Sequence, residues 1–239
     1  MRNGCLLVLA GFYMAGVNSY AMGLRSFVAL PINKGGVVTR LVIDEIPETN
    51  NDRLTANVAY GVDSTQTLFM AAPYRLSSGG NDRFGDVSLL YRKNFWQDID
   101  SIDSARVGFL IGGVIPTDSD RDPRASIGLV ATRIDDRHEW DADILWQQGI
   151  DDALNTLRYD LSWQYRVYPQ EYPEWGLSSV MNTVVEFAGR GVEGETMVQQ
   201  FTLGFQWVVT PRWVLEGGVT RDLNGPDDTN YLISTRFHF

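Results

Sequence analysis

The chain has only two side chains that could act as an imidazole base, His138 and His238. His138 follows Asp135 and Asp136 in a polar stretch that indicates a turn, where a solvated histidine is expected. His238 lies one residue before the end of the chain, and Ser234 is about 13 Å away if both lie on a strand. That distance is too long for a direct Ser–His pair, and the sequence contains no Gly-x-Ser-x-Gly or Walker motif. We therefore expect no catalytic site; a hydrolase that uses His238 is the alternative.

Metal-binding and cofactor-binding patterns are equally weak. The acidic stretch Asp118–Asp122 resembles the first half of a calcium loop, but it lacks a glutamate at the distal spacing, so a solvated loop is expected. One cysteine excludes an intramolecular disulfide and a site built from several thiolates. The net charge of −10 argues against nucleic-acid binding, which needs a basic surface. We expect no metal, no cofactor, no nucleic-acid partner and no enzyme activity.

Arginines and carboxylates form the larger set of chemically capable residues, and they recur on one side of alternating segments. Of the 20 lysines and arginines, only Lys34 and Lys93 are lysine. Arginine grips a carboxylate with two parallel hydrogen bonds and stays charged, which suits a packed polar interior. Two roles stay open, because these charges could hold a wall together or line a path for a solute. The candidates are Asp86, Arg92, Arg106, Asp141, Asp143, Arg158, Asp160, Arg166, Glu186, Arg190, Glu216 and Arg236.

The elements that position these charges repeat every two residues. From Leu157 to Tyr168, apolar and aromatic residues take the odd positions, and mostly polar residues take the even positions from Arg158 to Tyr168. Strict alternation of this length is typical of a strand whose two faces meet different surroundings. The segments 200–209 and 231–239 repeat the pattern. Both therefore read as strands of the same kind.

Twelve such strands are expected. Their ranges are 37–46, 53–63, 66–76, 85–96, 105–115, 125–134, 139–149, 156–168, 178–190, 197–209, 212–222 and 230–239. Strands in soluble sheets average about 5–6 residues, whereas a tilted membrane-spanning strand needs about 9–11. No backbone group can stay unpaired in hydrocarbon, so the first strand should pair with the last. The predicted fold class is all-β, a transmembrane antiparallel up-and-down β-barrel of about twelve strands.

The predicted connections alternate in length. Those at 62–66, 134–138 and 209–212 are tight, and most of the others are longer and polar. Outer-membrane barrels have short turns at the periplasmic end, longer loops at the outer end and an even strand number. The links 97–104 and 169–177 fall on the short side but are longer than a tight turn.

The N-terminus reads as an export signal. Arg2 precedes an apolar run at 5–17 and a small-x-small ending at Ala21. The run spans about 20 Å as a helix, too little for a hydrocarbon core of ~30 Å. Cleavage after Ala21 would remove Cys5 and leave a mature chain without cysteine. The expected division is 1–21 signal peptide, 22–36 N-terminal segment that plugs or constricts the lumen, and 37–239 barrel.

Aromatic residues near strand ends, such as Trp96, Trp140 and Trp163, favour membrane lipid as the partner of the apolar face. A secreted β-sandwich also alternates, but its strands are shorter, so it is the alternative fold. In outer-membrane barrels, a last strand that ends on phenylalanine is recognised by the outer-membrane assembly machinery. Phe239 gives this chain such an ending.

Three stretches resemble the outer-membrane family named for the meta-pathway of phenol degradation, a transporter-like group. They are Phe-Gly-Asp-Val-Ser-Leu-Leu-Tyr-Arg at 84–92, Gly-Gly-Val-Ile-Pro-Thr-Asp at 112–118 and Thr-Pro-Arg-Trp-Val-Leu-Glu-Gly-Gly-Val at 210–219. Family members usually have glycine where this chain has Asp118. The resemblance covers about residues 55–239 and implies passage of small molecules, including hydrophobic or aromatic ones. It carries no functional residues over to this chain.

These observations predict a narrow channel or passive transporter in the outer membrane. Its lumen would filter small solutes by charge and size. A non-conducting structural or surface-interaction barrel is the first alternative, and the hydrolase is the second.

Overall fold

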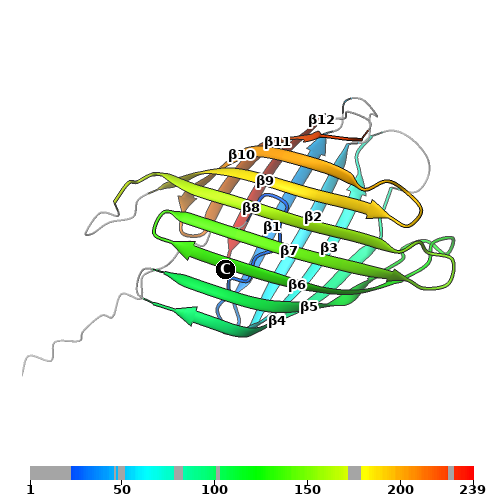
Figure 1. The fold of residues 1–239 in the computed structure, drawn as a ribbon, viewed down its shortest axis with the longest axis horizontal. Helices are drawn as coiled ribbons and strands as arrows, with labels where there is room; N and C mark the ends of the chain where they lie inside the picture. Colours follow the sequence, from blue (N-terminus) through cyan, green and yellow to red (C-terminus); the bar gives the residue numbers. More distant parts are fainter. Residues whose placement is uncertain are drawn as a thin grey trace, which may run out of the picture.

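The computed structural model describes residues 23–45, 47, 52–77, 83–100, 103–171, 179–225 and 229–239. Within these ranges the chain forms twelve strands and no helix (Figure 1). They are β1 (Val37–Glu45), β2 (Arg53–Asp63), β3 (Gln66–Arg75), β4 (Val87–Ile99), β5 (Ser104–Ile115), β6 (Arg124–Asp135), β7 (His138–Gly149), β8 (Thr156–Tyr168), β9 (Val180–Val192), β10 (Val198–Thr210), β11 (Trp213–Asp222) and β12 (Thr229–His238). None of the described residues belongs to a helix long and apolar enough to cross a membrane. The predicted signal peptide, 1–21, lies outside these ranges.

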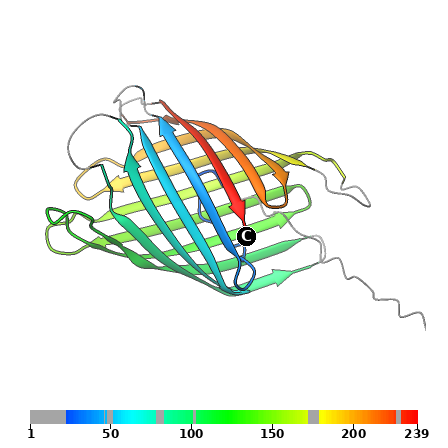
Figure 2. The same cartoon turned by 180° about the vertical axis from the view of Figure 1, so that it is seen from behind.

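The strands close into one antiparallel barrel in sequence order. The first and last strands complete the ring, with Val42 of β1 opposite Ser234 of β12. Figures 1 and 2 show the two opposite walls, whose tilted strands cross behind one another. The predicted all-β, up-and-down barrel and its closure through β1 and β12 are therefore confirmed.

The strand boundaries fall within three residues of the predicted ones. The largest difference is at β4, which runs to Ile99 rather than to residue 96. A bulge between Asn94 and Trp96 lets this strand continue its pairing with β5 beyond the predicted end. The tight connections after β2, β6 and β10 all lie at one end of the barrel, as their spacing predicts.

The two faces of the barrel differ as the alternation predicts. On β8, Leu161 is exposed on the outer face, whereas Asp160, Ser162 and Gln164 are buried inside. Tyr168 is an exception, because the sequence places it on the inner face and its side chain is 54% exposed. A bulge between Arg166 and Tyr168 shifts the register there and changes the face.

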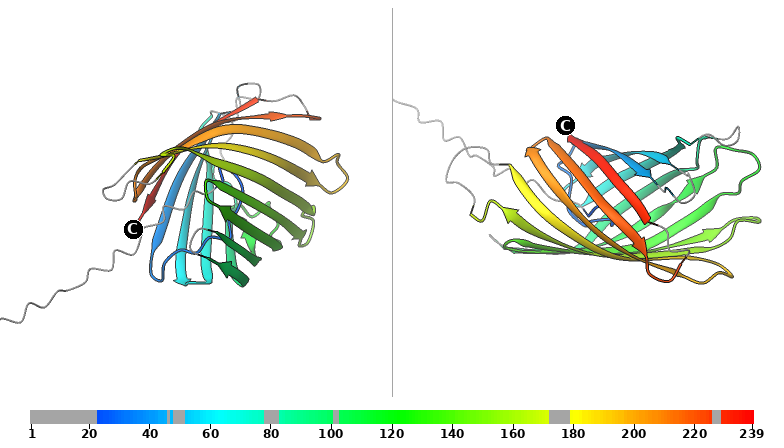
Figure 3. Two further views of the ribbon diagram at one scale, coloured as in Figure 1. Left: turned by 60° about the vertical axis from the view of Figure 1, so that its left-hand side comes forward. Right: turned by 90° about the horizontal axis from the view of Figure 1, so that it is seen from above.

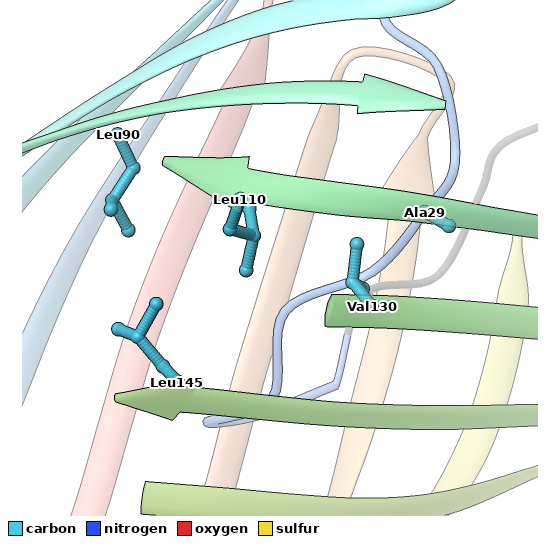
Figure 4. Packing of buried hydrophobic residues seen from close by; sticks show 5 residues of the cluster. All are labelled: Ala29, Leu90, Leu110, Val130 and Leu145. Atoms are coloured by element: carbon cyan, nitrogen blue, oxygen red, sulfur yellow. The ribbon is translucent and has the colours of Figure 1, made fainter. Parts of the chain in front are cut away.

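Part of the inner face is apolar. One inward residue from each of four neighbouring strands, β4 to β7, packs against Ala29 in a buried cluster (Figure 4). The four wall residues are Leu90, Leu110, Val130 and Leu145. The barrel therefore has a hydrophobic patch inside it, over a wall whose outer face is also apolar.

Candidate functional site

Residues 23–33 do not join the sheet and instead run through the interior of the barrel. Four of them, Leu24, Val28, Ala29 and Leu30, are at most 4% exposed. Both views in Figure 3 show this N-terminal stretch, in blue, within the ring of strands. We call residues 23–33 the inner segment.

A glycine turn joins the inner segment to β1. Gly35 has a φ of 78°, a backbone conformation that favours glycine. Its N–H donates to the carbonyl oxygen of Gly61 at 2.8 Å, and the N–H of Gly61 donates to Gly36 at 3.0 Å. A Cβ atom at Gly61 would lie 2.2 Å from the carbonyl oxygen of Asn33. The absence of side chains at this turn allows the inner segment to fold back into the lumen.

Side chains of β4 hold the carbonyl groups of the inner segment. The guanidinium of Arg92 donates to the carbonyl oxygen of Leu30 at 2.6 Å and also to that of Val28. Asn94, two residues along the same inner face, donates to the carbonyl oxygen of Ala29 at 2.7 Å. The carbonyl oxygens of three successive residues, Val28 to Leu30, therefore accept hydrogen bonds from side chains of β4.

The N–H groups of the inner segment are bound by side chains of β6 and β7, in the same wall as β4. The N–H of Phe27 donates to the carboxylate of Asp143 at 2.7 Å. The N–H of Ala29 donates to the hydroxyl of Thr132 at 2.8 Å, and this hydroxyl donates to Asp141 at 2.6 Å. Buried backbone groups need such partners, so these inward polar residues satisfy a chain that forms no ladder of its own.

The start of the inner segment is bound on β8, β9 and β10. Glu186 accepts hydrogen bonds from the N–H of Arg25 at 3.1 Å and from the hydroxyl of Ser26 at 3.2 Å. Arg158 donates to the carbonyl oxygen of Arg25 at 3.2 Å, and the Arg25 side chain donates to Gln200 at 2.9 Å. The inner segment thus contacts both walls of the barrel.

Apolar contacts complete this docking. The rings of Phe27 and Phe69 meet edge to face, with centroids 5.9 Å apart. The guanidinium of Arg158 lies over the ring of Phe27, 4.8 Å from its centroid. Together with Ala29, these contacts cover the apolar patch that would otherwise face the lumen.

Buried ion pairs support the inner face around the segment. Glu216 lies 2.7 Å from Arg40 and 3.1 Å from Arg236, and all three side chains are buried or nearly so. Arg40 also donates to the carbonyl oxygen of Leu24 at 2.6 Å, which links this triad to the inner segment.

A second cluster is centred on Asp160. Its carboxylate lies 2.7 Å from Arg158 and 2.5 Å from Arg190, and its side chain is fully buried. Arg158 also lies 3.5 Å from Asp143. Paired charges of this kind can remain buried because each carboxylate has a charged partner.

Most of the sequence-predicted candidates share the inner face. These are Arg92, Arg106, Asp141, Asp143, Arg158, Asp160, Glu186, Arg190, Glu216 and Arg236. Asp86 precedes β4, and its carboxylate pairs at 2.9 Å with Arg121 of the β5–β6 loop. Arg166 lies near the opposite end, 3.3 Å from Asp136 of a turn. These two residues belong to the rims rather than to the middle of the wall.

Sequence reasoning missed several residues that contact the inner segment. Arg25, Arg40, Asn94 and Thr132 were not among the candidates, although each makes a hydrogen bond described above. The apolar inner patch was missed too, although four neighbouring strands carry a signal for it. This signal is a pair of adjacent large apolar residues, of which one must point inward: Leu89–Leu90, Leu110–Ile111, Leu129–Val130 and Ile144–Leu145.

Neither histidine is placed in a Ser–His pair by the contacts of the described residues. His138 accepts a hydrogen bond from the indole of Trp163 at 3.1 Å. Near His238, the hydroxyl of Ser234 donates to Glu216. This carboxylate engages the hydroxyl, which gives no support to a serine nucleophile paired with His238. No group of three or more His, Cys, Asp or Glu residues in the described part of the chain could hold a metal ion.

Comparison with known proteins finds no matching family model and no matching curated protein. Solved structures do match. A NanC porin is 12% identical, with 83% of this chain and 98% of that chain covered and a TM-score of 0.56. An outer-membrane channel from Pseudomonas putida F1 is 15% identical, with 88% and 98% covered and a TM-score of 0.53. A KdgM porin in complex with disordered oligogalacturonate is 9% identical, with 85% and 99% covered and a TM-score of 0.52. At these identities the likeness shows a shared barrel fold.

Proposed function

We propose that this protein is a passive channel of the outer membrane whose lumen is closed by the inner segment. The observation that carries the proposal is the closed barrel, apolar outside, with residues 23–33 docked in its interior through side-chain bonds to their backbone. The plugging role predicted for 22–36 is part of this proposal, and the docking of the described residues 23–33 supports it. The solute would be a small molecule, because the inner segment and the side chains that bind it from both walls narrow the lumen.

Membrane lipid is the proposed partner of the outer surface. Large apolar residues such as Ile127, Leu203 and Ile233 are more than half exposed there, and soluble monomers rarely expose contiguous apolar surface of that extent. Because the barrel is closed, no strand has an unpaired edge, and a lipid environment requires this pairing of the backbone. Export through a signal at 1–21 and recognition of β12 by the assembly machinery belong to the same proposal.

The kind of contact that holds the inner segment supports a channel that opens. Its polar contacts are hydrogen bonds, each worth about 0.5–1.5 kcal/mol net, and more where a charge takes part. Water can replace such partners once the lumen is hydrated. The turn at Gly35 lies before the start of β1, so the inner segment could turn there without breaking the strand pairing of the barrel.

The family resemblance stays part of the proposal, as does the class of small hydrophobic or aromatic solutes that it implies. The second candidate function is a barrel that does not conduct. Its support is the same dense docking, because a permanent plug would also need both walls of the barrel to bind it.

Planar-bilayer conductance tests the proposal. The refolded chain without residues 1–21 should show low conductance with openings, and a chain without residues 1–36 should conduct continuously. A chain that carries Arg133→Gln on the outer wall is the matched control, because this exposed arginine makes no contact with the segment. A barrel that stays sealed after the deletion would exclude a channel and leave the non-conducting barrel.

A further inference from the structure

The barrel wall binds the inner segment mainly through its peptide groups. Residues 27–33 form no helix, strand or turn, so wall side chains supply the hydrogen bonds that such an element would make. Arg92 and Asn94 donate to carbonyl oxygens. Asp143 and Thr132 accept from N–H groups. Because every peptide carries these groups, the same side chains can bind the backbone of another peptide in the lumen.

The site of Phe27 favours an aromatic side chain. Its ring meets the edge of Phe69 on one side, with centroids 5.9 Å apart, and the guanidinium of Arg158 lies 4.8 Å from its centroid. Aromatic pairs and cation–π contacts both need a ring at this position. An aliphatic side chain would keep only part of this contact.

Two residues further along the segment, the site favours a small apolar side chain. Ala29 is completely buried against the apolar patch of β4 to β7 (Figure 4). Protein interiors are close-packed, so a larger side chain at this place would force the wall apart. The wall therefore selects a sequence in which an aromatic residue precedes a small apolar one by two positions.

Glu186 offers more hydrogen-bonding capacity than the inner segment uses. Its Oε1 atom accepts from the N–H of Arg25 at 3.1 Å and from the hydroxyl of Ser26 at 3.2 Å. Its Oε2 atom is buried and has no hydrogen-bond partner among the described residues, although buried polar atoms normally have one. A peptide that began at the position of Arg25 would bring an ammonium group to this carboxylate, with two more donors and a positive charge.

We infer that the place occupied by the inner segment is a binding site for short peptides with a free amino terminus, an aromatic third residue and a small apolar fifth residue. Residues 25–30, Arg-Ser-Phe-Val-Ala-Leu, show the sequence that fits it. Such a peptide competes with the inner segment for the same wall side chains. The inference rests on the proposed function, because the site becomes free only when the inner segment leaves, and it names the class of the small solute.

Lys34 allows the inner segment to be separated from the barrel after folding. It is exposed and precedes β1, and the only other lysine of the chain, Lys93, lies in the paired part of β4. A lysine-specific endoprotease should therefore cut the folded full chain after Lys34, which breaks no strand pairing. Gel filtration in detergent then removes the fragment that carries the inner segment.

Fluorescence anisotropy of the hexapeptide Arg-Ser-Phe-Val-Ala-Leu, with a dye at its carboxyl end, measures binding to the cut barrel. Saturable binding is expected. The uncut chain should bind at least about tenfold more weakly, because its tethered segment competes at a high effective concentration. A fragment that stays bound after the cut should be displaced by excess hexapeptide. Absence of saturable binding to the emptied barrel, or a fragment that the hexapeptide cannot displace, would overturn the inference.

Altered hexapeptides test the three recognition features and leave the barrel itself unchanged. Acetylation of the amino terminus removes the ammonium group and should weaken binding about tenfold. Leucine in place of phenylalanine should weaken it about fivefold, and leucine in place of alanine about tenfold. A hexapeptide of the same composition in scrambled order is the control and should not bind. Equal affinity of the scrambled and native sequences would count against a specific site.

A variant of the barrel tests the role of Glu186. Glu186→Gln should reduce the preference for the free over the acetylated hexapeptide, because the ammonium group loses its counter-charge. Arg133→Gln, exposed on the outer wall, should keep this preference. An unchanged preference in Glu186→Gln would contradict the placement of the amino terminus at this carboxylate.

The binding assay and the conductance assay can fail independently. Binding in detergent requires no conduction, so a barrel that binds the hexapeptide and stays sealed in bilayers would contradict the proposed channel alone. A barrel that conducts without its inner segment and does not bind the hexapeptide would contradict the peptide site alone.

Discussion

The guanidinium of Arg92, on the inner face of β4, donates a 2.6 Å hydrogen bond to the carbonyl oxygen of Leu30 in the inner segment. The same guanidinium donates to the hydroxyl of Thr67 at 2.7 Å, which fixes its position on the wall. A fully buried arginine that binds backbone carbonyls in this way acts as a clamp on the segment. Each residue from Leu24 to Leu30 therefore has a partner on the inner face of the barrel.

Replacing Arg92 with glutamine should loosen the inner segment. The change removes charge-assisted hydrogen bonds, each worth roughly 1.5–3 kcal/mol, from the carbonyl groups of Val28 and Leu30. The ratio of open to closed time in single-channel recordings should rise about tenfold or more. Arg133→Gln serves as the control, because its side chain is 67% exposed on the outer wall. Unchanged gating in Arg92→Gln would show that this clamp does not hold the channel closed.

Adding a methyl group at Gly218 should interfere with Leu24. A Cβ atom there would lie 2.9 Å from Leu24 Cδ1, which is the nearest atom, so the leucine must move. Leu24→Ala should suppress the effect of Gly218→Ala, with a coupling free energy of about 0.5–3 kcal/mol between the two changes. Urea unfolding of the two single variants and the double variant measures this coupling.

Gly191→Ala is the matched control for that cycle. Its nearest neighbour is the flexible end of Met197, at 3.1 Å, and Leu24 does not lie near it. It should show no coupling with Leu24→Ala. Strictly additive effects of Gly218→Ala and Leu24→Ala would mean that Leu24 does not pack against this wall.

The sequence predicts the wall of this barrel well because alternation reports directly on its two faces. Each step of one residue exchanges the inside for the outside, so Asp160 inside and Leu161 outside can be read from the pattern alone. The exception at Tyr168 lies where a bulge inserts an extra residue. The register shifts at four places in the described strands, and none of the residues at their centres is a proline or a glycine: they are Val62, Phe95, Val167 and Val209.

The partners of the inward residues could not be predicted in the same way. Arg92 and Asp143 read as members of a ladder of ion pairs, yet both bind backbone groups of the inner segment. Backbone N–H and C=O groups are the same in nearly every residue. The sequence of 23–33 therefore does not indicate that its backbone would bind to side chains of the wall. The apolar half of the docking was more accessible, because the doublets such as Leu89–Leu90 place one large residue inside.

Replacing Glu216 with glutamine should destabilise the barrel. The carboxylate is fully buried between Arg40 and Arg236, and its removal leaves two buried guanidinium groups without their counter-charge. Loss of one partner from a buried pair costs about 3–5 kcal/mol. Asp135→Asn is the control, because its pair with Arg133 is exposed and 3.8 Å long, so a change of about 1 kcal/mol or less is expected. Equal shifts of the urea unfolding curves would contradict a structural role for the buried triad.

Brominated phospholipids should quench tryptophans on the outer wall and spare one placed in the lumen. Trp140 is 53% exposed and lies beside Trp163, with ring centroids 5.8 Å apart, near the end with the tight turns. Tryptophans gather at the interface between lipid and water because the ring is apolar and its N–H is polar. A variant that keeps Trp140 alone should therefore lose fluorescence in vesicles of brominated lipid.

In the matched variant, all seven native tryptophans are replaced with phenylalanine, and Phe27→Trp adds a single new one. Its only indole belongs to the inner segment, beside Phe69 and under Arg158. Brominated lipid should leave this fluorescence unchanged, because the closed wall separates the lumen from the acyl chains. Equal quenching of both variants would contradict the assignment of inside and outside, and a lack of quenching in both would favour a water-soluble β-protein. Quenching of Trp140 alone is the result that the barrel requires.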